Sequence, residues 1–351
     1  MRVVVVGATG NVGLSLVRAL SRERRVERVV AVARRRPPLE IPKVEWVEAD
    51  VVRSDLLPVV RGAKVVVHLA WHIQPSRDLN ALWRTNVEGS SRLFRAVAQA
   101  GVPALVYASS VGVYSRGPKQ ELVDESWPRD GIASSFYGLH KAEVERRLDR
   151  FEQEVPEARV VRLRPALTFK RESASGQRRL FAGPLVPTGL LRSRLVPLVP
   201  DIPGLRFQAV HTEDVAEAYR LAIVSNVRGA FNVAADPVID PPLIAELVRA
   251  RPIRLPAAVF RGAMWLTWHL RLQPSPPGWA DLALGTPLLD SSRARAELGW
   301  EPRHSGIEAL RELVEGLRGR VGASTPPLSP DAGGPLRLGE LASGVGARET
   351  A

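Results

Sequence analysis

The stretch RVVVVGATGNVG, residues 2–13, decides how this chain folds. Its first five residues are mostly β-branched, which is the pattern of a short strand buried on both faces. Three glycines follow at a spacing of three, and a helical pattern begins directly after them. This order is the context that a dinucleotide-binding loop requires. Gly7 would permit the tight turn, Gly10 would let the backbone approach a pyrophosphate, and Gly13 would let the helix pack closely on the sheet. A glycine-rich turn without a ligand is the alternative.

The rest of the chain alternates between strand and helix patterns. Strand patterns cover residues 2–6, 28–33, 44–48, 64–69, 104–108 and 159–164, and the longest helical patterns lie near 79–100 and 135–154. This alternation predicts an α/β fold: a Rossmann-like, doubly wound parallel sheet with a smaller substrate-binding region toward the C-terminus. We assign residues 1–165 and 211–235 to a dinucleotide-binding domain, residues 166–210 and 236–318 to the substrate-binding region, and residues 319–351 to a disordered tail.

The end of the second strand pattern carries an unusual run of arginines. A cofactor with a free ribose 2′-hydroxyl usually meets an acidic residue there, but this chain has Ala33 followed by Arg34, Arg35 and Arg36. Guanidinium groups suit a 2′-phosphate by charge and by geometry. The run therefore favours NADP over NAD, although a solvated basic loop in an arginine-rich protein is a competing interpretation.

A tyrosine and a lysine stand four residues apart in the second long helical pattern. Tyr137 and Lys141 therefore share one helix face, one turn apart. A lysine ammonium held there would lower the tyrosine pKa, so that the hydroxyl could exchange a proton near neutral pH. Because this spacing also arises by chance, its weight depends on the nucleotide loop that precedes it.

Taken in order, the motifs resemble those of the extended short-chain dehydrogenase/reductases of the NAD-dependent epimerase/dehydratase group. The resemblance runs from residue 1 to about residue 318. The matching segments are Gly7-x-x-Gly10-x-x-Gly13, Asp50-Val51, His68-Leu69-Ala70, Asn86-Val87-x-Gly89, Ser109-Ser110-x-x-Val113-Tyr114, Tyr137-x-x-x-Lys141 and Val210-His211-x-x-Asp214. The chain departs from the family pattern at the missing acid after the second strand, which puts NAD itself in doubt, and at His140, where the family often has a small residue.

The resemblance implies roles for particular residues. Tyr137 would be the general acid or base, Ser110 would orient the substrate oxygen, and Lys141 would tune the tyrosine and hold the ribose hydroxyls. Asn86 would support Lys141. The residues expected to bind the cofactor are Gly7, Thr9, Gly10, Asn11, Val12, Gly13, Arg34, Arg35, Asp50, Val51, Leu69, Ala70, Asn86, Tyr137, Lys141 and Pro165.

The resemblance also implies hydride transfer with NAD(P) on a hydroxyl or carbonyl carbon. Epimerisation, dehydration and simple reduction all remain open, and the substrate could be a nucleotide sugar. One alternative is an NADPH-dependent reductase of a sterol-like or other apolar carbonyl compound. Another is a redox regulator that binds NAD(P) without turnover, although such relatives usually lack the tyrosine and the lysine.

Composition fits an ordinary soluble enzyme. The chain of 351 residues has no cysteine and a formal net charge of +12. Only five of its 49 basic residues are lysine, and no nucleic-acid-binding motif is present, so we expect no nucleic-acid partner. The absence of cysteine and of a signal-peptide pattern favours the cytoplasm. His68 and His72 lack a third ligand nearby, and we expect no metal; a homodimer remains open.

One segment after residue 256 is strongly apolar. Residues 257–272 carry Phe260, Met264, Trp265 and Trp268, largely on one helical face. Core or the wall of a substrate pocket is the favoured interpretation. An interfacial membrane helix has the same pattern, but we do not expect membrane contact.

Overall fold

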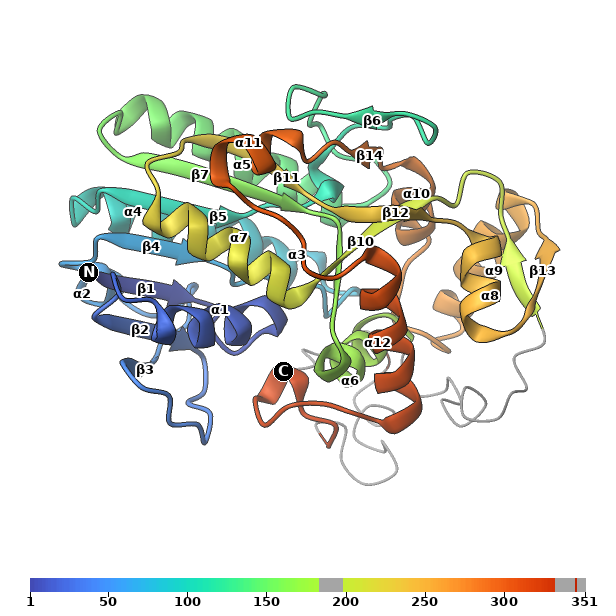
Figure 1. Cartoon of the computed structure of the whole chain (residues 1–351), viewed down its shortest axis with the longest axis horizontal. Coiled ribbons are helices and arrows are strands. Elements are labelled where there is room, and N and C mark those ends of the chain that lie inside the picture. Colours follow the sequence, from blue (N-terminus) through green and yellow to red (C-terminus); the bar gives the residue numbers. More distant parts are fainter. Residues whose placement is uncertain (183–197, 332–344, 346–351) are drawn as a thin grey trace.

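A seven-stranded parallel sheet forms the centre of the computed structural model, which describes residues 1–182, 198–331 and 345 (Figure 1). The strands lie in the order β3-β2-β1-β4-β5-β7-β11. The chain reverses its direction of progress between β1 and β4, so the sheet is doubly wound and the predicted Rossmann-like fold is confirmed. The strands are β1 (Arg2–Val6), β2 (Arg28–Ala33), β3 (Val44–Glu48), β4 (Val65–His68), β5 (Ala104–Ala108), β7 (Arg159–Pro165) and β11 (Gly229–Val233).

Helices cover both faces of this sheet because alternate side chains of each strand point to opposite sides. In β1, Val3 and Val5 pack in one buried cluster, whereas Val4 and Val6 pack in the other. The first cluster lies under α1 (Asn11–Arg22) and α7 (Thr212–Val224). The second lies under α2 (Leu57–Val60), α4 (Gly89–Gln99) and α5 (Phe136–Glu154). One π-helical turn, Arg84–Glu88, joins α4 to the short α3 (Leu79–Trp83).

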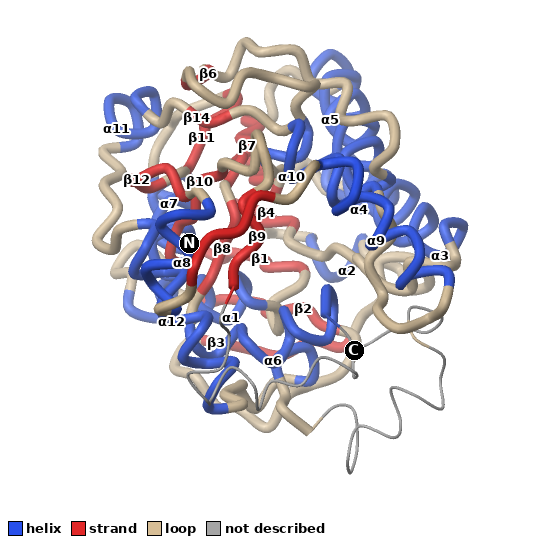
Figure 2. Tube along the Cα trace, turned by 90° about the vertical axis from the view of Figure 1, so that its right-hand side faces the viewer, coloured by secondary structure: helices blue, strands red, loops and turns tan. Residues whose placement is uncertain are grey.

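Most of the chain beyond β7 forms small sheets and helices around the carboxyl end of the large sheet (Figures 1 and 2). A three-stranded sheet consists of β8 (Leu167–Phe169), β10 (Phe207–His211) and β12 (Ala235–Ile239). Two smaller sheets have two strands each. One pairs β9 (Leu198–Asp201) with β13 (Arg251–Arg254), and the other pairs β6 (Leu122–Val123) with β14 (Leu288–Leu289). The helices are α6 (Ala174–Gln177), α8 (Pro241–Val248), α9 (Ala257–His269), α10 (Gly278–Gly285), α11 (Ser292–Leu298) and α12 (Gly306–Gly319).

The boundary between the two predicted parts is less sharp than the sequence indicated. Leu298 and Trp300 fall in the region that we assigned to substrate binding, yet they belong to the buried cluster under α7. The functional division of the chain therefore stays a prediction.

The predicted disordered tail needs a correction for residues 319–331. Val321 accepts a hydrogen bond from Ser175 Oγ at 2.8 Å, and Arg179 donates to the carbonyl oxygens of Pro327 and Ser329. Leu328 is buried. This segment is ordered because Arg179 binds its carbonyl oxygens and because it buries an apolar side chain. Residues 332–344 and 346–351 lie outside the described residues.

The interpretation of residues 257–272 as core or pocket wall is wrong. Helix α9 has no buried residue, and none of its residues lines the cavity described below. Among the described residues, no helix is long and apolar enough to cross a membrane.

Candidate functional site

A cavity of about 840 Å³ opens at the carboxyl ends of the central strands. This is where a doubly wound sheet binds its ligands. The loop after β1, the ends of β2, β4 and β5, and the first turns of α5 all contribute to its wall. Of the residues that we predicted for the site, those lining the cavity are Gly7, Thr9, Gly10, Asn11, Val12, Gly13, Arg34, Asp50, Val51, Leu69, Ala70, Ser110, Tyr137, Lys141 and Pro165.

The glycine loop has the geometry of a phosphate cradle. Gly7 has a φ of +89°, and a Cβ atom there would lie 2.6 Å from the backbone nitrogen of Ala70. A Cβ atom on Gly13 would lie 2.3 Å from the carbonyl oxygen of Gly7. Gly10 differs, because its Cβ would meet nothing closer than 3.5 Å. Gly10 also begins α1 without a capping side chain. No capping side chain binds the first N–H groups of α1. These groups could therefore donate hydrogen bonds to the pyrophosphate of a dinucleotide.

Local caps place the catalytic candidates. Ser135 Oγ accepts a hydrogen bond from the Gly138 N–H at 3.3 Å and starts α5, so Tyr137 lies in the first turn and Lys141 one turn later. Ser110 starts the short turn Val111–Val113 by accepting from the Gly112 N–H at 3.1 Å. The Ser110 side chain lies close enough to the Tyr137 hydroxyl to lower the tyrosine pKa. The structure therefore brings all three predicted side chains to one wall of the cavity.

Gly112 has a role that we did not predict. A Cβ atom on Gly112 would lie 2.8 Å from Cε1 of Tyr137. The ring of Tyr137 can take its position only because this residue has no side chain. Gly112 follows Ser110 by two residues, so the strand-end serine motif itself offered a signal.

The electrostatics of Tyr137 differ from our prediction. Burial raises its pKa, and the neighbouring Ser110 side chain only partly opposes this effect. The Lys141 ammonium donates to the Ala108 carbonyl oxygen at 2.6 Å and lies 3.5 Å from the ring centroid of Trp71. Burial lowers the pKa of Lys141 well below its usual value, and Glu145 opposes this shift. Tyr137 is therefore held in its protonated form at neutral pH.

Two predicted cofactor residues lie elsewhere. Asn86 is fully buried in the π-helical turn, and its amide exchanges two hydrogen bonds of 2.8 Å with the backbone of His72. It thus fixes the segment that carries Trp71 and His72 rather than contacting Lys141. Arg35 is exposed and does not line the cavity, whereas Arg34 does. Successive side chains at the end of a strand point in opposite directions. The sequence did not indicate whether Arg34 or Arg35 faces the cavity.

Aromatic side chains that we did not predict surround Tyr137. The ring centroid of Trp279 lies 5.1 Å from that of Tyr137, and that of Trp71 lies 5.9 Å away. Phe181 packs edge-on against Trp279 at 4.8 Å, and Phe207 also lines the cavity. Trp71 directly follows a strand-end motif, which is a usable sequence signal. Trp279 comes from α10 and has none.

A buried ion pair supports the wall behind the catalytic candidates. Arg164 binds Glu145 through Nε at 2.9 Å and Nη2 at 2.6 Å, and both side chains are almost completely buried. Ser109 Oγ donates to the same carboxylate at 2.5 Å. Glu145 lies one turn after Lys141 on α5. The pair therefore fixes α5 to β7 and to the end of β5.

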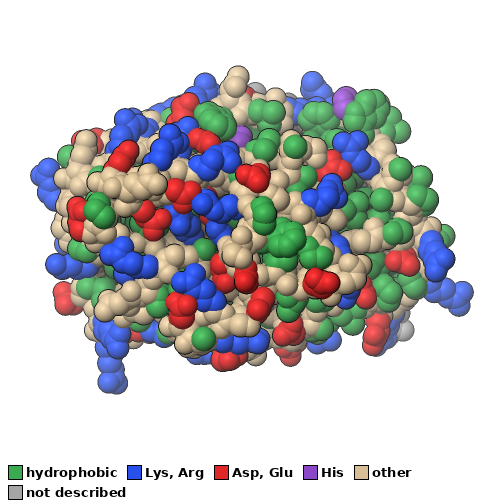
Figure 3. Space-filling view, turned by 90° about the horizontal axis from the view of Figure 1, so that it is seen from above, with side chains coloured by type: hydrophobic (Ala, Val, Ile, Leu, Met, Phe, Trp, Pro, Cys, Tyr) green, Lys and Arg blue, Asp and Glu red, His purple; other side chains and the backbone are tan. Residues whose placement is uncertain are grey.

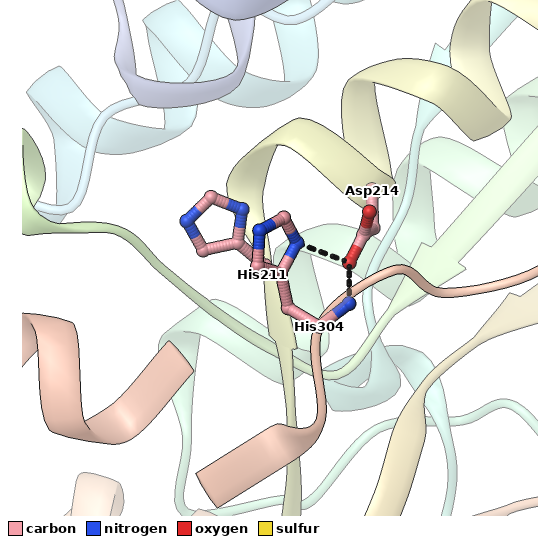
Figure 4. A group of neighbouring side chains, drawn as sticks. All are labelled: His211, Asp214 and His304. Atoms are coloured by element: carbon pink, nitrogen blue, oxygen red, sulfur yellow. Dashed lines mark hydrogen bonds and ion pairs between the residues drawn. The ribbon is translucent and has the colours of Figure 1, made fainter. Parts of the chain in front are cut away.

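A second polar cluster lies at the end of β10, where α7 begins, and joins it to α12 and the chain before it (Figure 4). His304 donates to Asp214 from its backbone and from Nδ1, both at 3.0 Å, and His211 bonds Glu312 at 3.1 Å. The two imidazole rings stack at 4.0 Å with 37° between their planes. Although these side chains are close enough to share a metal ion, the lone pairs of stacked rings lie in the ring planes and do not converge. We interpret the cluster as a structural clamp.

Comparison with known proteins identifies the family. Residues 3–234, more than half of the chain, match the model of the NAD dependent epimerase/dehydratase family. The chain belongs to this family. It is therefore an NAD(P)-dependent enzyme of the short-chain dehydrogenase/reductase type, and the resemblance seen in the motifs is confirmed.

Relatives of similar length support this assignment. An uncharacterised protein of Mycobacterium tuberculosis is 27% identical over 332 residues, which cover 90% of this chain and 83% of the relative. The UDP-glucose 4-epimerase of Thermus thermophilus, solved with NAD, has a TM-score of 0.68 and 25% identity over 92% of this chain and 100% of that chain. The protein MoeE5, solved with UDP-glucose and NAD, has a TM-score of 0.66 and 25% identity over 91% of this chain and 99% of that chain.

Proposed function

We propose that this enzyme transfers a hydride reversibly at a hydroxyl-bearing carbon of a nucleotide sugar, with Tyr137 moving the proton of the hydroxyl. The observation that carries the proposal is the common cavity, in which Ser110, Tyr137 and Lys141 face the same space as the glycine loop. The nucleotide sugar is supported by the similarity to an epimerase of such a substrate.

A nicotinamide cofactor would accept or return the hydride. The glycine loop and the start of α1 would hold its pyrophosphate, and Asp50 and Val51 would contact its adenosine end. Lys141 would hold the nicotinamide ribose. To do so, its ammonium would either leave the carbonyl oxygen of Ala108 or donate to that oxygen and the ribose hydroxyls at the same time. The remaining chemistry belongs to side chains of this chain.

Tyr137 would give a proton to a substrate carbonyl oxygen or take one from a hydroxyl. Because burial raises its pKa, the side chain is ready to donate, which is the direction of carbonyl reduction. Ser110 would bind the same substrate oxygen and keep it within reach of the tyrosine. The aromatic wall would exclude water from this space.

The cofactor preference follows from Arg34. Arg34 lines the cavity directly after β2, where no acidic residue follows the strand, and Asp50 lines it after β3. We propose that Arg34 binds a 2′-phosphate, so NADP(H) should bind more tightly than NAD(H). Arg34→Ala should lose about 1.5–3 kcal/mol of NADP affinity, and Arg35→Ala, at the neighbouring exposed position, is the matched control. Calorimetric titration with both cofactors tests this, and equal affinity for NAD in the unmutated enzyme would refute it.

A second candidate substrate is an apolar carbonyl compound. The specific observation that favours it is the aromatic wall of Trp71, Phe181, Phe207 and Trp279 around Tyr137. Turnover of a panel of nucleotide sugars and apolar ketones with NAD(P)(H) separates the two. Tight cofactor binding without turnover of either class would instead favour a redox regulator.

The decisive experiment removes one hydroxyl. Tyr137→Phe should lower kcat on the identified substrate by roughly 10²–10⁴-fold, the usual contribution of a placed acid or base. Cofactor binding should persist, because the ring remains. Tyr107→Phe is the matched control, since the Tyr107 hydroxyl is buried without a hydrogen-bond partner among the described residues. Full activity of Tyr137→Phe would exclude the proposed chemistry.

A further inference from the structure

Helix α9 presents an apolar face to the outside of the molecule. None of its residues is buried, and Val259, Trp265 and Leu266 are each about half exposed. Leu270 and Leu272 continue this surface after the helix, and Ile253 of β13 is exposed as well. Figure 3 shows hydrophobic side chains gathered at the end of the molecule that carries α9 and β13 in Figure 1. We call the six exposed residues Ile253, Val259, Trp265, Leu266, Leu270 and Leu272 the α9 surface.

The apolar side chains of the α9 surface are arranged along the helix. Val259, Leu266 and Leu270 are separated by seven and four residues, so they form one stripe along the axis. Trp265 lies on the adjacent face and stacks on His269 with ring centroids 4.1 Å apart. Exposed tryptophan beside apolar side chains is common where proteins meet a membrane interface.

The segment of the chain that carries the α9 surface has an excess of positive charge, although Asp201 of β9 lies in register with Arg254. Residues 247–280 contain no aspartate or glutamate. They contain five arginines, all exposed: Arg249, Arg251, Arg254, Arg261 and Arg271. Of these, Arg261 pairs with Asp281 of α10 at 2.9 Å. The apolar stripe thus lies in a segment with an excess of positive charge, which is complementary to an anionic surface.

The opposite edge of α9 attaches it to the body of the enzyme. The Arg77 guanidinium lies 4.3 Å from the ring centroid of Trp268 and also donates to the Trp268 carbonyl oxygen. The pair between Arg261 and Asp281 joins α9 to α10, the helix that carries Trp279. The α9 surface is therefore presented on a supported helix, one helix away from the catalytic tyrosine.

We propose that the α9 surface docks on an anionic phospholipid bilayer, with α9 lying in the plane of the interface. A second copy of the chain fits less well, because a two-fold interface would bring two copies of the same arginine-rich segment together. The docking does not depend on which substrate the enzyme uses.

Co-sedimentation of the full chain with vesicles tests this proposal. We expect binding to vesicles of phosphatidylcholine mixed with phosphatidylglycerol, weaker binding at high salt because the charges are screened, and little binding to phosphatidylcholine alone. Trp265→Ser combined with Leu266→Ser should reduce the partition coefficient about tenfold or more, since both side chains would leave the apolar phase. Arg251→Gln combined with Arg254→Gln should reduce only the part that depends on anionic lipid.

The control replaces an equally exposed leucine elsewhere. Leu122 of β6 is 51% exposed, and Leu122→Ser should bind vesicles as the unmutated protein does. Thermal unfolding of each variant checks that the fold is intact. No binding to anionic vesicles, or unchanged binding of the Trp265/Leu266 variant, would overturn the proposal. A dimer that this variant converts to a monomer, without vesicle binding by the unmutated protein, would assign the surface to self-association instead.

Discussion

Helices α1 and α9 have nearly the same length but opposite surroundings. In α1, six of twelve residues are buried, among them Leu14, Leu16 and Leu20, and the arginines lie on the other face. In α9, none of thirteen residues is buried, although the helix is richer in apolar side chains. The difference shows that an apolar helix is buried only where the fold supplies a partner. The sheet supplies one for α1, whereas only one edge of α9 meets the rest of the described chain.

The same contrast applies to ion pairs, and here the expected effect is largest. Glu145→Ala leaves the buried Arg164 without its carboxylate partner and should cost about 3–5 kcal/mol of unfolding free energy. Arg261→Ala removes the corresponding partner of Asp281 at the surface of α9, where the arginine is 49% exposed, and should cost less than about 1 kcal/mol. Denaturant unfolding of both variants measures the two losses of unfolding free energy. Similar losses would mean that the surroundings of Arg261 are as tightly packed as the core.

The buried pair also predicts a pH dependence. Burial alone would raise the pKa of Glu145, but the charge and hydrogen bonds of Arg164 outweigh burial and lower it. The contribution of the carboxylate is complete above its unfolded pKa of about 4.3 and is lost as the pH falls through the lower folded pKa. Unfolding of Glu145→Gln should therefore depend less steeply on pH in this acidic range.

Leucine truncation extends the comparison to the C-terminal segment. Leu328 is 3% exposed, whereas Leu266 is 51% exposed. Leu328→Ala should cost about 2–5 kcal/mol, because the methyl groups leave a cavity. Leu266→Ala should stay within about 0.5 kcal/mol, as for surface substitutions elsewhere. Thermal unfolding decides this, and a negligible effect at Leu328 would return residues 319–331 to the disordered tail that the sequence predicted.

Glycine replacement should change the stability in opposite directions in the two helices. Gly13→Ala places a Cβ atom 2.3 Å from a backbone oxygen, which should cost about 1–3 kcal/mol. A Cβ atom on Gly262 of α9 meets nothing within 4 Å, so Gly262→Ala should stabilise the protein by about 0.5–1 kcal/mol through helix propensity. Thermal unfolding of both variants measures the two signs. Destabilisation by Gly262→Ala would show that something covers this part of α9.

Much of the nucleotide-binding half could be predicted because its signals are local. The strand pattern of residues 2–6 and the spacing of Gly7, Gly10 and Gly13 depend on neighbours along the chain, and the structure places them as expected. The family resemblance implied that Ser110 and Tyr137 share a site, and both side chains line the same cavity.

Other features depend on contacts that no local pattern encodes. Asn86 binds the backbone of His72 rather than supporting Lys141, and Trp279 reaches Tyr137 from α10. The pKa of Tyr137 is set by burial more than by the neighbouring lysine, and burial is a property of the assembled core.

The sequence by itself determined the doubly wound sheet and the glycine loop, because backbone propensity and side-chain periodicity act over a few residues. The catalytic candidates came from the resemblance of its motifs to a known family. Only the tertiary structure decided which arginine faces the cavity, which aromatic rings surround the tyrosine, and that the apolar α9 remains uncovered by the described residues. The physical reason is that the hydrophobic effect is non-directional. It favours the removal of an apolar side chain from water, but the packing of elements distant in sequence determines whether that side chain can be buried.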